Sequence, residues 1–333
     1  MGKDLQKTAR GEADEMVLII DTTMWNRPVG KEIANVFRSP MIGLPQDEPK
    51  FNVHVVDPRA LNSTLKTAVN MVFVMSLDNE SSMGKAMRRY FSNNSLKLIQ
   101  KDSSIFMTVK RDEFAKGQIV MYLYAQNEAF LKKKILENKS TMLEVFESAV
   151  RERTRRQSLS KLERTLMSSV TEDHGYSIKI PYGWDMAKNL KDFVWVRKLE
   201  AESESNVFIY ERPYTDQNVF DEIGELRDEI TETYLRDSEE ISLYITRQQQ
   251  FPLFTERVNF HNHFAVSARG LWKNSDFSGG GPFVSFTLVD EPSQKLYYVE
   301  GYVYSPGTKK KKMIREVEAI ISTFKTPSDL VVQ

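Results

Sequence analysis

The chain has 333 residues, of which 41% are hydrophobic and 28% charged, with 46 basic and 46 acidic side chains. This length can form two domains of ordinary size, and no apolar run reaches the roughly 18 residues needed to cross a bilayer. The lack of cysteine excludes disulfides, thiolate metal sites and cysteine nucleophiles. Zero net charge disfavours a nucleic-acid binder, so we expect no nucleic-acid partner.

The two halves of the chain carry opposite net charge. Residues 1–170 contain 27 Lys and Arg against 20 Asp and Glu, whereas residues 171–333 contain 19 against 26. This asymmetry could steer a charged partner, but we expect instead that the halves attract each other.

The first half alternates strands and helices, which is typical of an α/β layer. Hydrophobic patterning predicts the following elements: strands at 16–20, 51–57 and 69–77, helices at 29–37 and 60–67, and an antiparallel hairpin of 104–109 with 118–125 that turns near Gly117. Residues 128–170 contain almost no Gly or Pro and keep a helical apolar period. They predict one long helix, or two with a break near Asn138.

The second half is richer in strands and predicts an antiparallel sheet with helices packed on it. The expected elements are an opening strand at 175–184, strands at 193–196 and 207–210, a helix at 219–234, strands at 253–260, 264–272, 283–290 and 295–304, and a last helix ended by Pro327.

We therefore predict an α+β protein made of two α/β sandwich-like domains, the first with a mixed sheet and the second with an antiparallel sheet, joined by a long helix. The expected boundaries are a flexible leader at 1–15, an N-terminal domain at 16–127, the bridging helix at 128–170, a C-terminal domain at 171–327 and a tail at 328–333.

Three consecutive glycines, Gly279 to Gly281, could cradle a phosphate, line an oxyanion hole or serve the backbone. A phosphate loop needs a following helix and a lysine, but residues 283–290 have a strand pattern, and no Gly-x-Ser-x-Gly elbow occurs in the chain. The interpretation that remains is a hairpin loop, where glycine permits positive φ and close backbone approach. Trp272 and Phe283 are then expected to make this loop a contact surface.

Two further motifs each allow a binding interpretation and a structural one. His261 and His263 alternate as zinc ligands on a strand would, but Asn262 between them is typical of a tight hairpin turn, which we prefer. The segment 44–49 (LPQDEP) holds two carboxylates and an amide between two prolines. It predicts a stiff displayed loop that binds a cation or a peptide, or else a structural linker.

A basic patch is formed by Arg151, Arg153, Arg155 and Arg156 in the expected bridging helix. It could dock on anionic lipid or another polyanion, but we expect it to pack against the acidic half.

Five ordered motifs resemble one known family. They are EMVLIID (15–21) with Trp25 and Gly30, LPQDEPKF (44–51), RGLW (269–272), GGGPFVSF (279–286) and VEGYVYSPGTKKKK (299–312). Over about residues 9–325 the chain resembles an uncharacterised family of Bacteroidetes cell-envelope lipoproteins, a domain of unknown function. More weakly, residues 175–325 resemble the PsbP-like fold, whose members are usually binding or assembly modules.

The resemblance implies a signal peptide and a lipidated cysteine, neither of which occurs in this chain. We expect the signal peptide and the lipidated cysteine upstream of Lys3, and thus a lipid anchor in the cell envelope. Whether Met1 and Gly2 belong to the native sequence is left open. The family carries no assigned activity, so it transfers no catalytic residue, cofactor or metal.

Our functional hypothesis is a noncatalytic envelope protein that binds a protein or polysaccharide partner, with oligomeric state left open. The residues expected to bind are Trp25, Gln46, Glu48, Arg269, Trp272 and Phe283. The alternative is a hydrolase or carbohydrate-binding enzyme at the domain junction, with a site assembled from Asp47, Glu48, Arg269 and His263.

Overall fold

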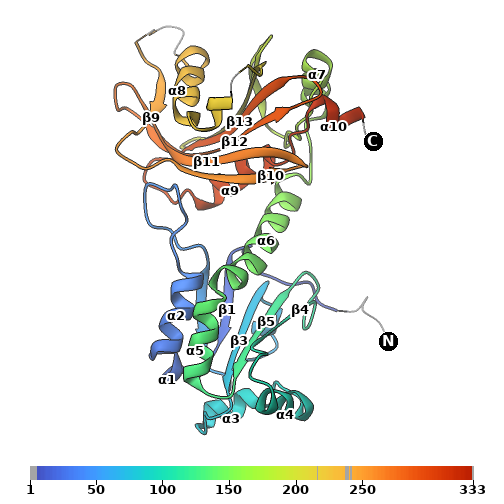
Figure 1. Cartoon of the computed structure of the whole chain (residues 1–333), viewed down its shortest axis with the longest axis vertical. Coiled ribbons are helices and arrows are strands. Elements are labelled where there is room, and N and C mark those ends of the chain that lie inside the picture. Colours follow the sequence, from blue (N-terminus) through green and yellow to red (C-terminus); the bar gives the residue numbers. More distant parts are fainter. Residues whose placement is uncertain (1–5, 216, 237–239, 241, 332–333) are drawn as a thin grey trace. The chain divides into compact units, whose positions relative to one another are not determined.

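The structure is a computed structural model that describes residues 6–215, 217–236, 240 and 242–331 (Figure 1). The chain divides into two units, one of residues 1–40 and 49–153, the other of residues 41–48 and 154–333. Unit 1 has a mixed sheet and unit 2 an antiparallel sheet, each with helices, so the expected α+β class is confirmed. Within the described residues, no helix combines the length and apolar character required to span a membrane.

The sheet of unit 1 has five strands in the order β2-β1-β3-β5-β4. In this order, β2, β1, β3 and β5 run parallel to one another, and β4 is an antiparallel edge strand next to β5. Their bounds are β1 (Glu15–Ile19), β2 (Asn52–Val56), β3 (Asn70–Ser76), β4 (Met107–Arg111) and β5 (Ile119–Ala125). Every residue of β3 and β5 is buried, as expected of central parallel strands covered on both faces. The predicted strands of the first half are thereby confirmed.

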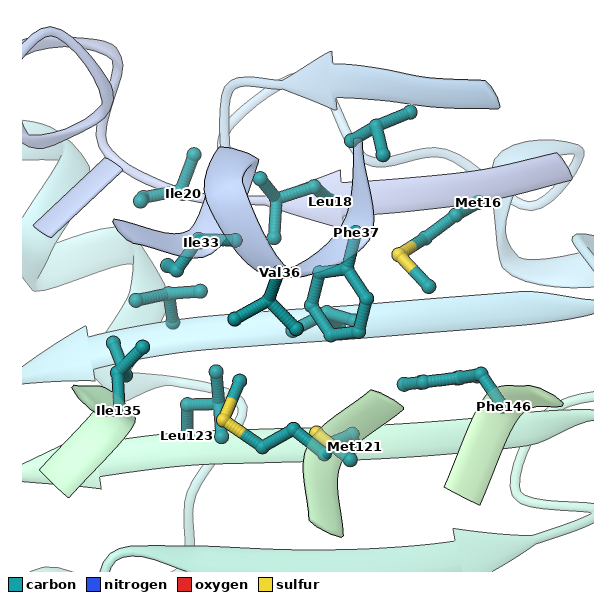
Figure 2. Close-up of a cluster of buried hydrophobic side chains, with 14 of the residues drawn as sticks. Met16, Leu18, Ile20, Ile33, Val36, Phe37, Met121, Leu123, Ile135 and Phe146 are labelled. Carbon is teal, nitrogen blue, oxygen red and sulfur yellow. The ribbon is translucent and has the colours of Figure 1, made fainter. Parts of the chain in front are cut away.

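Helices cover both faces of this sheet. They are α1 (Thr22–Trp25), α2 (Pro28–Phe37), α3 (Ser82–Arg88), α4 (Asn93–Lys101), α5 (Glu128–Glu137) and α6 (Lys139–Ser158). Figure 2 shows α2, through Ile33, Val36 and Phe37, packed over strand residues that include Leu18 and Met121. Met75, Met87 and Ile99 belong to a second apolar cluster on the opposite face, with α3 and α4.

Two helix predictions in the first half need correction. Residues 60–67 contain only a 3₁₀ turn, η2 (Leu65–Thr67), because the Asn62 side chain accepts hydrogen bonds from the N–H groups of Thr64 and Leu65 and closes a local turn. The helical region from residue 128 does break at Asn138, but it also ends at Ser158 and resumes as α7 (Arg164–His174). Of the expected leader and tail, residues 1–5 and 332–333 lie outside the described residues.

Unit 2 is built on an eight-stranded antiparallel sheet with the strand order β10-β11-β12-β13-β8-β7-β6, and β9 pairs with β11. The bounds are β6 (Asp185–Leu190), β7 (Phe193–Leu199), β8 (Glu204–Pro213), β9 (Ile245–Arg247), β10 (Phe254–Phe260), β11 (His263–Asn274), β12 (Gly280–Asp290) and β13 (Lys295–Tyr304). The four long strands expected between residues 253 and 304 are confirmed.

Helices lie on both faces of this sheet as well (Figure 1). The helical elements of unit 2 after α7 are η3 (Gln217–Phe220), α8 (Ile223–Tyr234), α9 (Lys311–Ile321) and α10 (Pro327–Val331). One apolar cluster contains Ile314, Val317 and Ile320 of α9, and the cluster on the other face contains Leu226 and Ile230 of α8. The predicted opening strand at 175–184 is instead an extended segment with isolated bridges at Ser177 and Pro181, and the first strand begins at Asp185.

Candidate functional site

A groove in unit 2 brings together two of the motifs singled out in the sequence. It has a volume of about 450 Å³ and is lined by the glycine run 279–281, by Gln46 of the LPQDEP segment and by Tyr304, the last residue of β13. All of its lining residues belong to unit 2. Chain segments far apart in sequence therefore converge on one surface depression.

The groove lies where two neighbouring strands stop pairing. The β12–β13 ladder ends at the pair Phe283–Tyr302, although β13 continues to pair with β8 as far as Tyr304. Pro282, the next residue of β12, has no N–H to donate, and the Val303 carbonyl accepts a hydrogen bond from Trp272 Nε1 at 3.2 Å. The ladder pairing of β12 with β13 thus stops at this point, although Gly281 still lies close to Val303.

Two of the three glycines, Gly280 and Gly281, are required here by close packing. A Cβ on Gly281 would lie 2.1 Å from the Val303 carbonyl oxygen, and one on Gly280 would lie 2.7 Å from the Trp272 carbonyl oxygen. None of the three glycines has a positive φ. The expected role in close backbone approach is confirmed, whereas the expected role in positive φ is wrong.

Side-chain amides supply most of the neutral polar lining. Gln46, Gln248 and Gln250 all border the groove. Gln248 Nε2 donates to the Trp272 carbonyl at 3.4 Å, so its position is set by the adjacent strand. An amide side chain both donates and accepts hydrogen bonds, which suits ligands with alternating donors and acceptors.

The loop between β11 and β12 contributes an exposed aromatic ring. Phe277 is 72% exposed and has a φ of 64°, a strained value for a side chain of this size. Its ring lies 3.6 Å from Lys273 Nζ, a cation–π contact. Hydrogen bonds from Ser278 fix the same loop and hold the pKa of Asp276 below its usual value.

Two lysines make this groove basic. Lys273 lies on β11, and Lys310, which directly precedes α9, is only 6% exposed. Lys310 Nζ donates to the Thr308 carbonyl at 2.8 Å.

A second depression of about 510 Å³ adjoins the first. The two share Tyr304 and Pro306. The second is also lined by residues 200–203, which connect β7 to β8, and by Glu204 at the start of β8, so it holds Glu200, Glu202 and Glu204. A hydrogen bond from Lys198 holds the pKa of Glu200 below its ordinary value. The surface is therefore basic on one side of Tyr304 and acidic on the other.

Glu48 is not displayed as the sequence predicted. It is 3% exposed, and its Oε1 and Oε2 accept hydrogen bonds from the backbone N–H groups of Lys310 (2.7 Å) and Lys311 (3.3 Å). Lys310 is the N-cap of α9 and offers no capping side chain, so Glu48 supplies the acceptor from a distant part of the chain. The structural interpretation of this segment applies to Glu48, while Gln46 and Asp47 beside it are exposed.

Trp272 and Phe283 are core residues, so the expectation that they form an exposed contact surface is wrong. Trp272 is 4% exposed and Phe283 1% exposed, both in the cluster beneath α8. The indole of Trp272 occupies space that glycine at 281 leaves open, with its Nε1 3.2 Å from where a Cβ would stand. Trp272 and Phe283 therefore lie near the glycine run because they pack in the core there, and not because they form a contact surface.

The remaining predicted binding residues lie apart from the groove lining. The guanidinium of Arg269 on β11 forms an ion pair with Glu318 of α9. Trp25 belongs to unit 1, where it packs against the α2 side of the sheet and the Arg38 guanidinium lies 5.2 Å from its ring. Of the six residues, only Gln46 lines the groove.

A tight turn forms at the two histidines, as preferred from the sequence, with His261 in the turn and His263 directly after it. His261 and Asn262 have φ values of 51° and 73° and connect β10 to β11 in a two-residue hairpin. The two rings contact different groups. His261 Nε2 lies 2.9 Å from the Ser322 carbonyl oxygen, and His263 Nε2 lies 3.0 Å from the Asp329 carboxylate. Among the described residues, no cluster of three or more metal-ligating side chains occurs.

The arginines of the basic patch include one with a clear structural role. Arg153 on α6 donates from its guanidinium to the Asn70 side chain at 2.7 Å and to the carbonyls of Val69 and Gly117. These contacts lie within unit 1 and tie α6 to the ends of β3 and β5.

A fully buried ion pair was not predicted. Arg227 of α8 donates two hydrogen bonds of 2.9 Å to Glu300 of β13, and Tyr298 donates a third at 2.6 Å. The Arg227 guanidinium also lies 4.1 Å from the Phe283 ring. Burial raises the pKa of Glu300 and, with the nearby carboxylate, that of Tyr298. The spacing of Arg227 from Ile223 and Ile230 places it on the apolar side of α8, and this was the signal available in the sequence.

Comparison with solved structures finds distant likenesses. The Ran-binding protein Mog1p of Saccharomyces cerevisiae is 8% identical, with a TM-score of 0.31, covering 46% of this chain and 90% of its own. A point mutant of the protein Mog1 is 9% identical, with a TM-score of 0.31, covering 47% and 94%. Human StAR-related lipid transfer protein 5 is 12% identical, with a TM-score of 0.25, covering 54% and 96%. Likenesses at this level carry no inference about this chain.

Sequence comparison identifies the chain at the level of domains. No curated protein matches it. Residues 9–159 match the domain of unknown function DUF8532, and residues 163–323 match the domain of unknown function DUF4837. Two domains of unknown function thus cover most of the chain.

Proposed function

We propose that this protein is a noncatalytic, lipid-anchored module of the cell envelope that binds a partner through the groove between Gln46, the glycine run and Tyr304. The observation that carries the proposal is the convergence of amides, an exposed ring and two lysines from separate segments on one depression. Concave sites with a few convergent polar groups are the usual location of ligands.

The character of the lining favours recognition over chemistry. Amide, hydroxyl and aromatic groups orient and hold a ligand through hydrogen bonds and ring contacts. The ammonium of Lys273 contacts the Phe277 ring, and that of Lys310 donates to a backbone carbonyl. These contacts hold both lysines in place as fixed cationic contacts for a ligand.

The envelope location and the anchor rest on the family resemblance described from the sequence motifs, whereas the PsbP-like character of unit 2 rests on the separate, weaker resemblance of residues 175–325. The full-length gene tests the location and the anchor: a signal peptide followed by a lipidation cysteine upstream of Lys3 is the expected result. A gene that starts at Met1 without either feature would remove the anchor from the proposal.

The hydrolase alternative is less favoured. Its four residues all belong to unit 2, yet Glu48 caps α9, Arg269 pairs with Glu318 and His263 contacts Asp329. Each of these three is held by a different structural contact. Hydrolysis of chromogenic glycoside or ester substrates that is lost in Glu48→Gln, with folding retained, would reverse this preference.

The binding role can be tested with two aromatic residues of nearly equal exposure. Phe277 at the groove is 72% exposed and Tyr182, elsewhere in unit 2, is 70% exposed. A photoreactive phenylalanine analogue placed at each position in envelope preparations should capture a discrete partner only from position 277. The substitution Phe277→Ala should weaken binding of that partner at least tenfold, whereas Tyr182→Ala should leave it unchanged.

Equal capture from both positions, or none from position 277, would contradict the proposal. Thermal melts of both variants provide the folding control, since each removes a ring that is mostly in solvent.

A further inference from the structure

We infer that the ligand of this surface is an extended polypeptide segment with an acidic group at one end and a basic group about four residues away. The inference rests on the proposed function and deepens it. It starts from the two depressions that share Tyr304 and Pro306, which we take together as one groove across the end of the sheet.

The two ends of this groove have opposite charge. Lys273 and Lys310 line the first depression. Glu200, Glu202 and Glu204 line the second, where Glu200 already pairs with Lys198. An anionic group of a ligand therefore fits the first end, and a cationic group fits the second.

The length of the ligand follows from the order of the strands. Lys273 on β11 pairs with Gly280 on β12, and Tyr304 on β13 pairs with Glu204 on β8. These strands are neighbours in the order β11-β12-β13-β8, so three strand spacings of about 4.8 Å separate the backbones of Lys273 and Glu204 by about 14 Å. The two side chains leave opposite faces of the sheet, so a ligand that reaches both crosses the strand ends. An extended peptide covers this distance in about four residues at ~3.3 Å each.

The middle of the groove suits a peptide backbone. Gln46 and Gln248 offer amides that can pair with peptide N–H and C=O groups, and Tyr304 and Pro306 offer apolar area between the charged ends. A neutral polysaccharide would use the amides and rings but neither set of charges. The two opposite charges therefore favour a polypeptide.

The test compares defined probes bound to the full chain. Two acetylated, amidated hexapeptides of the same composition, rich in Gly and Ser, would carry one Glu and one Lys, either four positions apart or adjacent. Chitohexaose would serve as the neutral polysaccharide probe. Backbone amide shifts of Gly280 and Ser203 in the ¹⁵N-labelled protein report on the two ends of the groove.

We expect the spaced peptide to shift both amides and to bind at least fivefold more tightly than the adjacent isomer. Lys273→Ala should abolish this advantage for the peptide with Glu, and it should weaken a peptide in which Gln replaces Glu by a smaller factor. Glu204→Gln should likewise abolish the advantage for the peptide with Lys, and it should have a smaller effect on a peptide in which Gln replaces Lys. Melting temperatures of both variants serve as the folding control.

Equal binding of the two isomers would overturn the inference. Shifts with chitohexaose and with neither peptide would also overturn it, while the groove would remain a binding surface. Failure of the proposed function itself would appear separately, as loss of the difference between positions 277 and 182 in the capture experiment.

Discussion

Replacing Glu48 by alanine should destabilise unit 2 although the residue lies far along the chain from the helix that it caps. Its carboxylate accepts hydrogen bonds from the backbone N–H groups of Lys310 and Lys311, and the residue is 3% exposed. The substitution leaves these two donors without their acceptor and removes a negative charge from the N-terminus of α9.

The expected loss is about 3 kcal/mol. Hydrogen bonds to a charged group contribute ~1.5–3 kcal/mol each and loss of a helix cap costs ~1 kcal/mol, but these values overlap and water partly replaces the lost acceptor. Glu48→Gln keeps one acceptor and should lose about 1–2 kcal/mol. For a unit of this size, 3 kcal/mol lowers the melting temperature by roughly 6–12 °C.

Tryptophan fluorescence can report unit 2 alone. Trp25 lies in unit 1, whereas Trp184, Trp195 and Trp272 lie in unit 2. In a Trp25→Phe background, urea unfolding followed by fluorescence therefore measures the free energy of unfolding of unit 2. Asp47→Ala is the matched control, since this neighbouring carboxylate is exposed.

The reasoning fails if Glu48→Ala costs less than about 1 kcal/mol, or no more than Asp47→Ala, which should stay within about 0.5 kcal/mol of the parent. Either result would mean that α9 is capped equally well by water or by another group.

Three further comparisons test other parts of the fold by urea unfolding. Gly281→Ala should cost about 3 kcal/mol because its Cβ meets a backbone oxygen at 2.1 Å, whereas Gly279→Ala, whose Cβ meets movable side chains at 3.1–3.3 Å, should cost under about 1 kcal/mol; equal losses would refute this. Arg227→Met should cost about 3–5 kcal/mol by leaving Glu300 buried and unpaired, and adding Glu300→Gln should recover part of it; no recovery would contradict the pairing argument. Burial raises the pKa of Asp21, but hydrogen bonds from Ser81, Asn79 and backbone N–H groups outweigh it and lower the pKa below its ordinary value. The stabilisation lost in Asp21→Asn should therefore be constant above about pH 5 and shrink as the pH falls through the pKa of the folded state; a pH-independent difference would argue against it.

Periodicity in the sequence predicted most strands and helix α9 because these elements bury one face against a core. However, α9 ends at Ile321, and Pro327, which was expected to end the last helix, begins α10 instead. The stripe of Ile314, Val317 and Ile320 and the buried runs of β3 and β5 are properties of short segments. The helix at 60–67 failed because a local hydrogen bond to Asn62 competes with helix formation, an effect that apolar spacing does not report.

The candidate site was only partly predictable, because its positions depend on pairing between distant segments. The glycine run and Gln46 were noticed as motifs, but their meeting depends on where the β12–β13 ladder ends. Trp272 appeared to be a loop aromatic, and only the neighbouring strand, with glycine at 281, shows that it is buried. The amide run at 248–250 between two strands was a signal that the sequence offered and that was not used.

Residues 41–48 belong to unit 2 although the chain on both sides of them belongs to unit 1. Glu48 and Lys310, whose backbone N–H donates a hydrogen bond to it, are 262 positions apart. At a translation rate of about 5–20 residues per second, the start of α9 is synthesised roughly 13–52 s after Glu48. A fragment that begins at residue 163, where the DUF4837 match starts, would have the helix but never receive this loop.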